Sequence, residues 1–190
     1  MGFSGSWIGV RGLSPEQVNT ALQLRPSGSR EDVPESDHSG AQLPNGFYLV
    51  VFLRKELSRE FLSRISAAFP LIYGFAEEHV MYSTAASWQE GREVWSVIHD
   101  AQQGIMHLDV RGTPPLPYPA IRESLFAEQA QAGGRDAGVD YIFDIPIDLA
   151  YEITGFRYDQ DVQETGKNGF EVLEPYGEKP GILKRLFRRN

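Results

Sequence analysis

The sequence predicts an α+β fold in which three to four helices pack on a mostly antiparallel, twisted sheet. Two observations support this prediction. Between Glu78 and Gly112, three strand-like runs follow one another and are separated by two short turn sequences, which is typical of an antiparallel meander. On both sides of this stretch, strand-like runs alternate with segments that carry helix-capping residues and an apolar stripe at helical spacing. We expect the three-strand meander to lie at the centre of the sheet.

The residues before the meander predict two strands and two helices. Residues 3–11 read as a strand, and residues 14–17, SPEQ, combine a capping serine, a proline at the first helical position and a capping-box glutamine. Residues 46–53, GFYLVVFL, lack polar alternation and are typical of a strand buried on both faces. Ser58 is the expected cap of a second helix, which ends at Pro70.

Residues 25–45 are expected to form a long mobile loop. Serine, proline, glycine and acidic residues dominate this segment, and it contains almost nothing apolar to bury. We expect His38, inside this loop, to be exposed to solvent.

The meander itself is predicted as strands at residues 79–88, 93–99 and 105–111. The first turn is Gln89–Arg92, where Gly91 can adopt a positive φ, and the second covers residues 100–104. This arrangement should bring Trp88 and Trp95 close together near the first turn.

After the meander, the proline-rich residues 112–119 favour a stiff, extended segment. The sequence then predicts a helix to about residue 131, a strand at 139–145, a short helix closed by Gly155 and a weak strand at 170–173. Residues 181–190 are basic and have amphipathic spacing. We therefore expect one α+β domain, residues 1–180, followed by a basic tail.

A short motif suggests a weak internal duplication. Val10-Arg11-Gly12 occurs again as Val110-Arg111-Gly112, and in each case a proline-started helix follows. A further strand and a second helix are predicted after each of these helices, so both halves read as a β-α-β-α unit. The hypothesis requires the same strand order in both halves.

Composition limits the classes of function. The net charge of −8 disfavours binding of nucleic acid or anionic lipid by the body of the protein, although the basic tail could contact either weakly. The absence of cysteine excludes disulfides and thiolate chemistry. Without an export signal or an apolar run of membrane-spanning length, the expected location is the cytoplasm.

Candidate catalytic residues are few. His99, His107 and Asp109 fall on or beside two neighbouring predicted strands, and imidazole and carboxylate groups can hold a metal or act as a base and its orienting partner. Glu78 is a further acidic candidate. No HExxH, phosphate-binding loop or nucleophile elbow occurs, so no metal or cofactor is expected.

Candidate binding residues fall into two groups. The tryptophan-bearing turn combines aromatic anchors with charge, and the segment before residue 38 is acidic; both features suit a basic protein partner. The residues of the first group are Trp88, Glu90, Arg92 and Trp95, and those of the second are Glu31, Asp32, Glu35 and Asp37.

These observations favour a non-enzymatic, cytoplasmic protein-binding module. A specific form of this hypothesis is a bacterial inhibitor or immunity-type protein that neutralises a basic toxin or effector. One alternative is a small metal- or histidine-dependent hydrolase that uses His99, His107 and Asp109. Another is a membrane-peripheral structural protein that acts through its basic tail.

Overall fold

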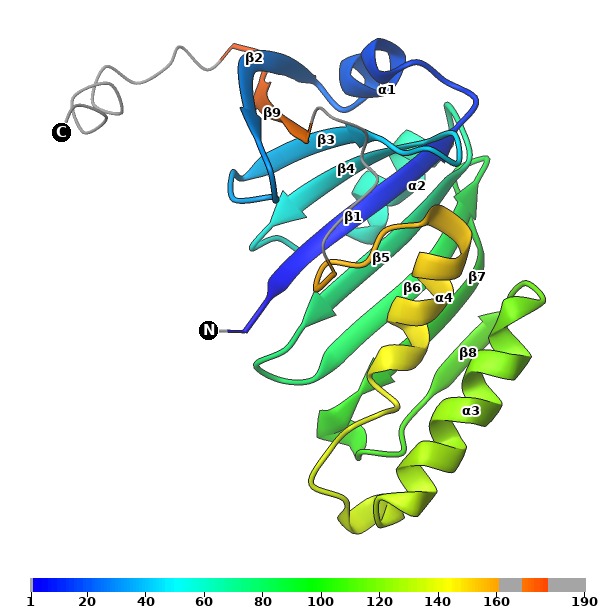
Figure 1. Ribbon diagram of the computed structural model, residues 1–190. Helices are drawn as coiled ribbons and strands as arrows, with labels where there is room; N and C mark the ends of the chain where they lie inside the picture. Colours follow the sequence, from blue (N-terminus) through cyan, green and yellow to red (C-terminus); the bar gives the residue numbers. More distant parts are fainter. Residues whose placement is uncertain (1, 161–168, 178–190) are drawn as a thin grey trace, which may run out of the picture.

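The computed structural model describes residues 2–160 and 169–177, and it confirms the predicted α+β class (Figure 1). Nine strands form one sheet in the order β2-β9-β3-β4-β1-β5-β6-β7-β8, and all neighbouring strands are antiparallel. The strands are β1 (Ser4–Arg11), β2 (Leu24–Glu31), β3 (His38–Gln42), β4 (Phe47–Leu53), β5 (Leu71–Glu77), β6 (Tyr82–Gln89), β7 (Arg92–Asp100), β8 (Asp109–Gly112) and β9 (Phe170–Pro175).

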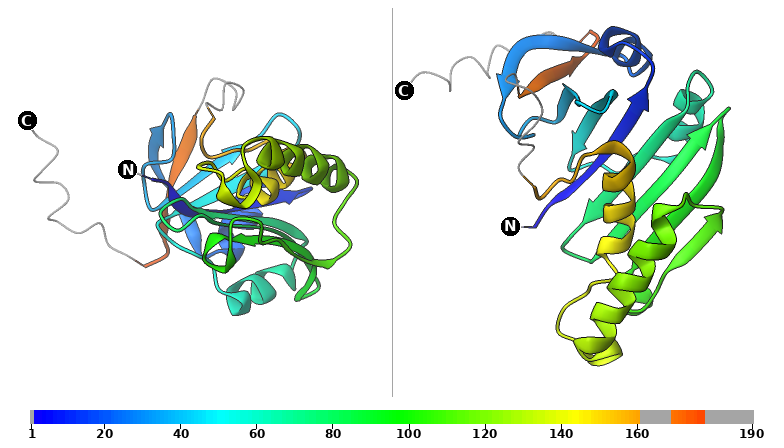
Figure 2. Two further views of the ribbon diagram at one scale, coloured as in Figure 1. Left: turned by 90° about the horizontal axis from the view of Figure 1, so that it is seen from below. Right: turned by 45° about the vertical axis from the view of Figure 1, so that its right-hand side comes forward.

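Helices cover both faces of this sheet. The α-helices are α1 (Pro15–Ala21), α2 (Arg59–Ser66), α3 (Pro117–Gln131) and α4 (Asp144–Thr154), and the short 3-10 helices are η1 (Ala101–Gln103) and η2 (Gly134–Asp136). Seen from below, the sheet separates α2 from α3 and α4 (Figure 2). We refer to the two sides as the α1–α2 face and the α3–α4 face.

Strand β1 is the centre of the sheet, with β4 on one side and β5 on the other. Its side chains alternate between the two cores, because successive residues of a strand point to opposite faces. Trp7 packs in the α3–α4 core and Ile8 in the α1–α2 core, both without exposed surface. A Cβ atom at Gly74 would lie 2.1 Å from the Trp7 ring, so the indole requires glycine on the neighbouring strand.

The helix caps and the hairpin turn predicted from short stretches of sequence are confirmed. The Ser14 side chain accepts the N–H of Gln17, and the Gln17 side chain accepts the N–H of Ser14, which completes the predicted capping box. Ser58 caps α2 in the same way. In the turn between β6 and β7, Glu90 and Gly91 both have positive φ angles, as a two-residue hairpin turn requires.

The predicted meander forms as β6, β7 and β8, but it lies at one end of the sheet and not at its centre. The meander lies at the end of the sheet because the strands that precede and follow it in the sequence all add to the sheet on the same side of it, next to β6. Strands β1 and β4 follow β5, and β9 returns from the far end of the chain to lie between β2 and β3.

The prediction of a loop over residues 25–45 is wrong, because most of this segment lies in β2 and β3. Strand β2 is polar because it is the edge of the sheet, where most of its side chains face solvent. Strand β3 has few large apolar residues because the side chain of Tyr48, on β4, lies directly against its backbone. A Cβ at Gly40 would lie 2.2 Å from the hydroxyl oxygen of Tyr48. His38 is half-buried and meets Phe52 edge-on, with ring centroids 5.5 Å apart.

The strand predicted at residues 139–145 is also wrong. Asp140 begins a turn there, and its carboxylate accepts the N–H groups of Ile142 and Phe143 before α4 starts at Asp144. The second half of the chain is therefore β8-α3-α4, without the strand that the first half has between its helices. This difference removes the support for an internal β-α-β-α duplication.

The weak strand predicted near the end of the chain is confirmed as β9. The basic tail, residues 181–190, lies outside the described residues. Within residues 2–160 and 169–177, no helix combines the length and the apolar composition that crossing a membrane requires.

Candidate binding groove

Helix α2 covers only one end of the strands beneath it. The Ser63 hydroxyl donates to the carbonyl oxygen of Gly91 at 2.7 Å, which fixes α2 over the turn between β6 and β7. The other ends of these strands, at Tyr82 and Asp100, extend away from that turn. The α1–α2 face is therefore left open over this part of the sheet.

Two adjoining hollows occupy the open part, and Tyr82 lines both of them. The first has a volume of about 440 Å³ and the second about 470 Å³. We call the two together the Tyr82 groove. The first hollow is lined by Ser4, Arg54, Glu56, Phe75, Glu77, Val80, Tyr82, Asp100 and Gln102, and the second by Tyr82, Ile98, Gln103, His107, Leu108, Asp109 and Arg111.

Tyr82 supplies the aromatic surface of the groove. Its ring packs against Phe75 from the neighbouring strand, with centroids 5.8 Å apart. Burial raises the pKa of the Tyr82 hydroxyl above its ordinary value, so the group is neutral at physiological pH. Tyr82 thus offers both a half-buried ring and a hydroxyl to a molecule in the groove.

Negative charge exceeds positive charge along the groove. Both guanidinium groups are already paired with carboxylates, Arg54 with Asp37 and Arg111 with Asp109, each at 2.8 Å. Glu56 faces the first hollow, and partial burial raises the pKa of its carboxyl group.

Glu77 and Asp100 complete the acidic side of the first hollow. A hydrogen bond from Ser4, and further contacts with His79, lower the pKa of Glu77. The Asp100 carboxylate accepts the side-chain amide of Gln103 and the backbone N–H of Gln102, and these bonds lower its pKa. Both groups are therefore ionised at neutral pH.

The predicted site at His99, His107 and Asp109 does not converge. His99 is fully buried on the α3–α4 side of β7, and its Nε2 atom lies 3.0 Å from the carboxylate of Asp140. Its Nδ1 atom lies 2.8 Å from the carbonyl oxygen of His107. Since both neighbours are acceptors, only the doubly protonated ring can donate to both of them.

The other two members of this set have separate partners. The His107 Nδ1 atom accepts the backbone N–H of Asp100 at 3.0 Å, and Asp109 pairs with Arg111. Among residues 2–160 and 169–177, no group of three histidines or carboxylates is arranged to hold a metal ion. His107 and Asp109 line the Tyr82 groove, while His99 belongs to the core.

Asp140 is the residue of this network that sequence reasoning missed. One of its oxygens faces His99, and the other accepts the N–H groups of Ile142 and Phe143, just before α4. An aspartate that bonds N–H groups two and three residues ahead forms a local turn, which is a recognisable sequence signal. The predicted strand at residues 139–145 obscured it.

Glu78 is part of the framework. Its carboxylate accepts the backbone N–H of Phe3 at 2.6 Å and the hydroxyl of Tyr158 at 2.9 Å. The rings of Phe3 and Tyr158 stack with centroids 4.1 Å apart. Glu78 therefore ties the start of β1 to the segment that follows α4, away from Glu77.

The two tryptophans proposed as binding anchors are buried in different cores. Trp88 is 3% exposed on the α1–α2 side and Trp95 is 6% exposed on the α3–α4 side. Ser87, and not Trp88, pairs with Trp95, which places the two indoles on opposite faces. Among the other predicted members of that site, Glu90 and Arg92 are exposed in the turn.

The predicted acidic residues before His38 do not act as one surface. The Glu31 carboxylate turns inward and accepts hydrogen bonds from Glu35, Ser36 and Ser39. Asp32 and Glu35 are exposed, and Asp37 is paired with Arg54.

Comparison with known proteins adds no family: no family model, curated protein or solved structure matches this chain.

Proposed function

We propose that this protein is a non-enzymatic protein-binding module and that its Tyr82 groove binds a basic segment of a partner protein. The observation that supports this proposal is the groove itself, an open hollow in which a tyrosine lies among carboxylates. Tyrosine is a favoured anchor of protein interfaces, since its ring packs while its hydroxyl forms hydrogen bonds.

The charges in the groove favour a cationic side chain. Among the residues that the structure describes, no lysine lines either hollow, and both arginines already pair with aspartates. Glu56, Glu77 and Asp100 are the carboxylates that a lysine or arginine of the partner would meet in the first hollow. The net charge of −8 would also accelerate the encounter with a basic protein.

An inhibitor that neutralises a basic toxin or effector is the specific form of this function that we propose. An acidic, open surface can block a basic active surface by covering it, without chemistry of its own. A hydrolase is less well supported, since the ring nitrogens of His99 are both in use and Asp109 pairs with Arg111. The membrane alternative depends on residues 181–190, which lie outside the described residues.

A peptide titration tests the proposal. The probe is a short peptide of alternating arginine and glycine, and binding is followed by the amide signals of the protein in NMR spectra at about 0.15 M salt, where attraction between distant exposed charges is screened. We expect the signals of groove residues to shift together. The variant Glu56→Gln/Glu77→Gln/Asp100→Asn should weaken binding about tenfold or more, since charged hydrogen bonds to the peptide are lost while the size and shape of the three side chains are kept.

A matched control distinguishes the groove from general attraction. The variant Glu16→Gln/Glu90→Gln/Glu152→Gln changes the net charge equally at three exposed sites outside the groove. Its affinity should stay within about twofold of the original, because screened surface charges contribute little. Equal weakening by both variants would overturn the proposal, and so would signal shifts confined to other surfaces.

A further inference from the structure

The two edges of the sheet differ in how they are protected. At one edge, β2 pairs only with β9, and it contains Pro26 and Gly28. Its register breaks between Pro26 and Arg30, and Gly28 has a φ of 82°. Proline, irregular register and local bending are features that prevent an edge strand from pairing with another chain.

Strand β8, at the other edge, is more regular. It pairs with β7 in regular register through its four residues, contains no proline, and reaches a positive φ, of 66°, at its last residue, Gly112; within the described residues it has no neighbour on its other side. Val110, at 38% exposure, is an apolar residue on this edge. An exposed, regular edge offers a template for another strand.

We propose that β8 pairs with β8 of a second copy of this protein, in antiparallel orientation about a twofold axis at Val110. The two nine-stranded sheets would then form one continuous sheet. The inference does not depend on the function proposed above.

The charge pattern of β8 is complementary to itself. In an antiparallel pair centred on Val110, Asp109 lies opposite Arg111 of the second copy, and Arg111 lies opposite Asp109 of the second copy. Directly opposed side chains of opposite charge stabilise antiparallel strands. Asp109 and Arg111 now pair with each other at 2.8 Å along the strand, with 38% and 57% of their side chains exposed, so each can reach a neighbour across the edge.

Helix α3 adds a second contact region. It lies beside the β8 end of the sheet in both views of the α3–α4 face (Figures 1 and 2). Antiparallel strands are related by an axis perpendicular to their sheet, so both copies of α3 would lie on the same face and run antiparallel. Leu125 and Gln129 are the buried residues of α3, and Tyr118, Ile121 and Phe126 are partly buried against the α3–α4 core.

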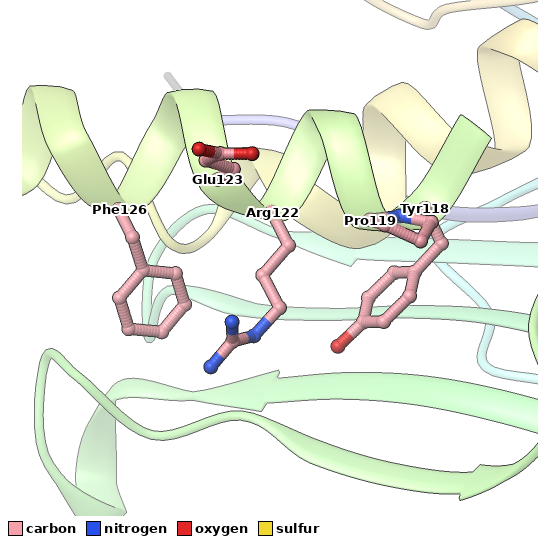
Figure 3. Close-up of a pocket in the computed structure, with 5 residues that line it drawn as sticks. All are labelled: Tyr118, Pro119, Arg122, Glu123 and Phe126. Carbon is pink, nitrogen blue, oxygen red and sulfur yellow. The ribbon is translucent and has the colours of Figure 1, made fainter. Parts of the chain in front are cut away.

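One side of α3 carries a hollow of about 600 Å³ that is lined by α3 alone. Tyr118, Arg122 and Phe126 are spaced by four residues and project to the same side of the helix (Figure 3). Arg122 stacks over Phe126, with its guanidinium carbon 4.7 Å from the ring centroid. A second α3 would supply the missing wall of this hollow.

The contact region is electrically neutral although the chain is acidic. Asp109 and Arg111 cancel on the strand, and Arg122 and Glu123 cancel on the helix. Two copies can therefore meet here without the repulsion that a net charge of −8 would otherwise produce.

Sedimentation velocity on the full chain tests the inference, over concentrations from about 1 to 200 μM that cover a modest interface. We expect a dimer that dissociates on dilution. Asp109→Arg places arginine opposite arginine, and Arg111→Asp places aspartate opposite aspartate, so each should weaken dimerisation about tenfold or more. The double variant Asp109→Arg/Arg111→Asp restores opposite charges across the axis and should return dimerisation to within about threefold of the original.

Asp32→Arg, an equal change in charge at an exposed site near the β2 edge, is the control and should leave dimerisation unchanged. Circular dichroism of each variant establishes that it is folded. A monomer at all concentrations would overturn the inference. A dimer that both single variants leave intact would overturn it as well, because another surface would then hold the copies together.

Discussion

The two faces of the sheet use polar residues differently. On the α3–α4 face, the buried polar side chains of His99, Gln129 and Asp140 have their partners within the chain. On the open part of the α1–α2 face, the carboxylates of the Tyr82 groove line an open hollow. The comparison suggests that the first set fixes the fold and that the second set is free to meet another molecule.

Gln129 illustrates the first set. Its amide nitrogen donates to the carbonyl oxygens of Gly134 and Val139, and its oxygen accepts the N–H of Tyr141. With Asp140, it holds the connection between α3 and α4 against the sheet. Removing such a residue leaves buried groups without partners, which costs more than the loss of an exposed contact.

The largest effect is expected for Asp140→Ala. The side chain of Asp140 is 8% exposed, and its loss leaves His99 without its buried partner and the N–H groups of Ile142 and Phe143 without an acceptor. The free energy of unfolding should fall by about 3–5 kcal/mol, because three hydrogen-bonding groups lose their partner at about 1–3 kcal/mol each. Urea denaturation measures it, with Asp32→Ala as the control within about 0.5 kcal/mol. A loss below about 1 kcal/mol for Asp140→Ala would contradict the structural role given to this face.

A smaller, pH-dependent effect is expected for Arg157→Leu. Arg157 contacts the carboxylates of Asp144, Asp148 and Asp159 beside α4. Burial raises the pKa of Asp144 and of Asp148, and Arg157 opposes that rise. A raised pKa in the folded state means that these groups favour folding most at low pH and lose that contribution as the pH rises through the folded-state pKa. Removing Arg157 raises both pKa values further.

The expected loss for Arg157→Leu is therefore about 2–3 kcal/mol near pH 7, the range for hydrogen bonds to charged groups, and clearly less near pH 4. Urea denaturation at the two pH values gives the difference. Arg54→Leu, which removes a pair whose two side chains are each 67% exposed, should show almost no loss at either pH. Equal losses for Arg157→Leu at both pH values would show that the carboxylates do not cause the effect.

The smallest effect is expected on the open part of the sheet, for Glu56→Gln. Partial burial raises the pKa of Glu56, so its ionised form is slightly unfavourable in the folded protein. After allowance for solvent screening, the free energy of unfolding should stay the same or rise by at most about 0.5 kcal/mol at neutral pH. The same urea experiment measures it. A fall in the free energy of unfolding of more than about 1 kcal/mol would show that Glu56 stabilises the fold, as the buried polar residues of the α3–α4 face do.

The sequence predicted the elements that neighbouring residues determine. The Ser14 capping box, the Ser58 cap and the turn at Gln89–Arg92 each depend on a few consecutive residues, and all three formed. Strand β2 was missed because its pairing depends on β9, with which it forms the Arg25–Glu174 ion pair across 149 residues. When the position of β2 at the edge of the sheet is not known, its polar residues indicate a loop.

The candidate site could be predicted less well from the sequence, because its residues also have partners that lie far away along the chain. The partners of Glu78 are Phe3 and Tyr158, each at least 75 positions away in sequence. The open groove depends on how much of the sheet α2 covers, and no local pattern specifies that coverage.

Strand β9 has a consequence for dividing the protein into fragments. It lies between β2 and β3, so both of its edges are paired, and it brings the fully buried Phe170 and the nearly buried Leu173 into the two cores. A fragment without β9 would keep eight strands but would contain an internal slot with two unpaired edges. A separate peptide with the sequence of β9 matches that slot in hydrogen bonding and in apolar side chains. The segment before Phe170 is therefore the natural place to split this chain for reassembly from two pieces.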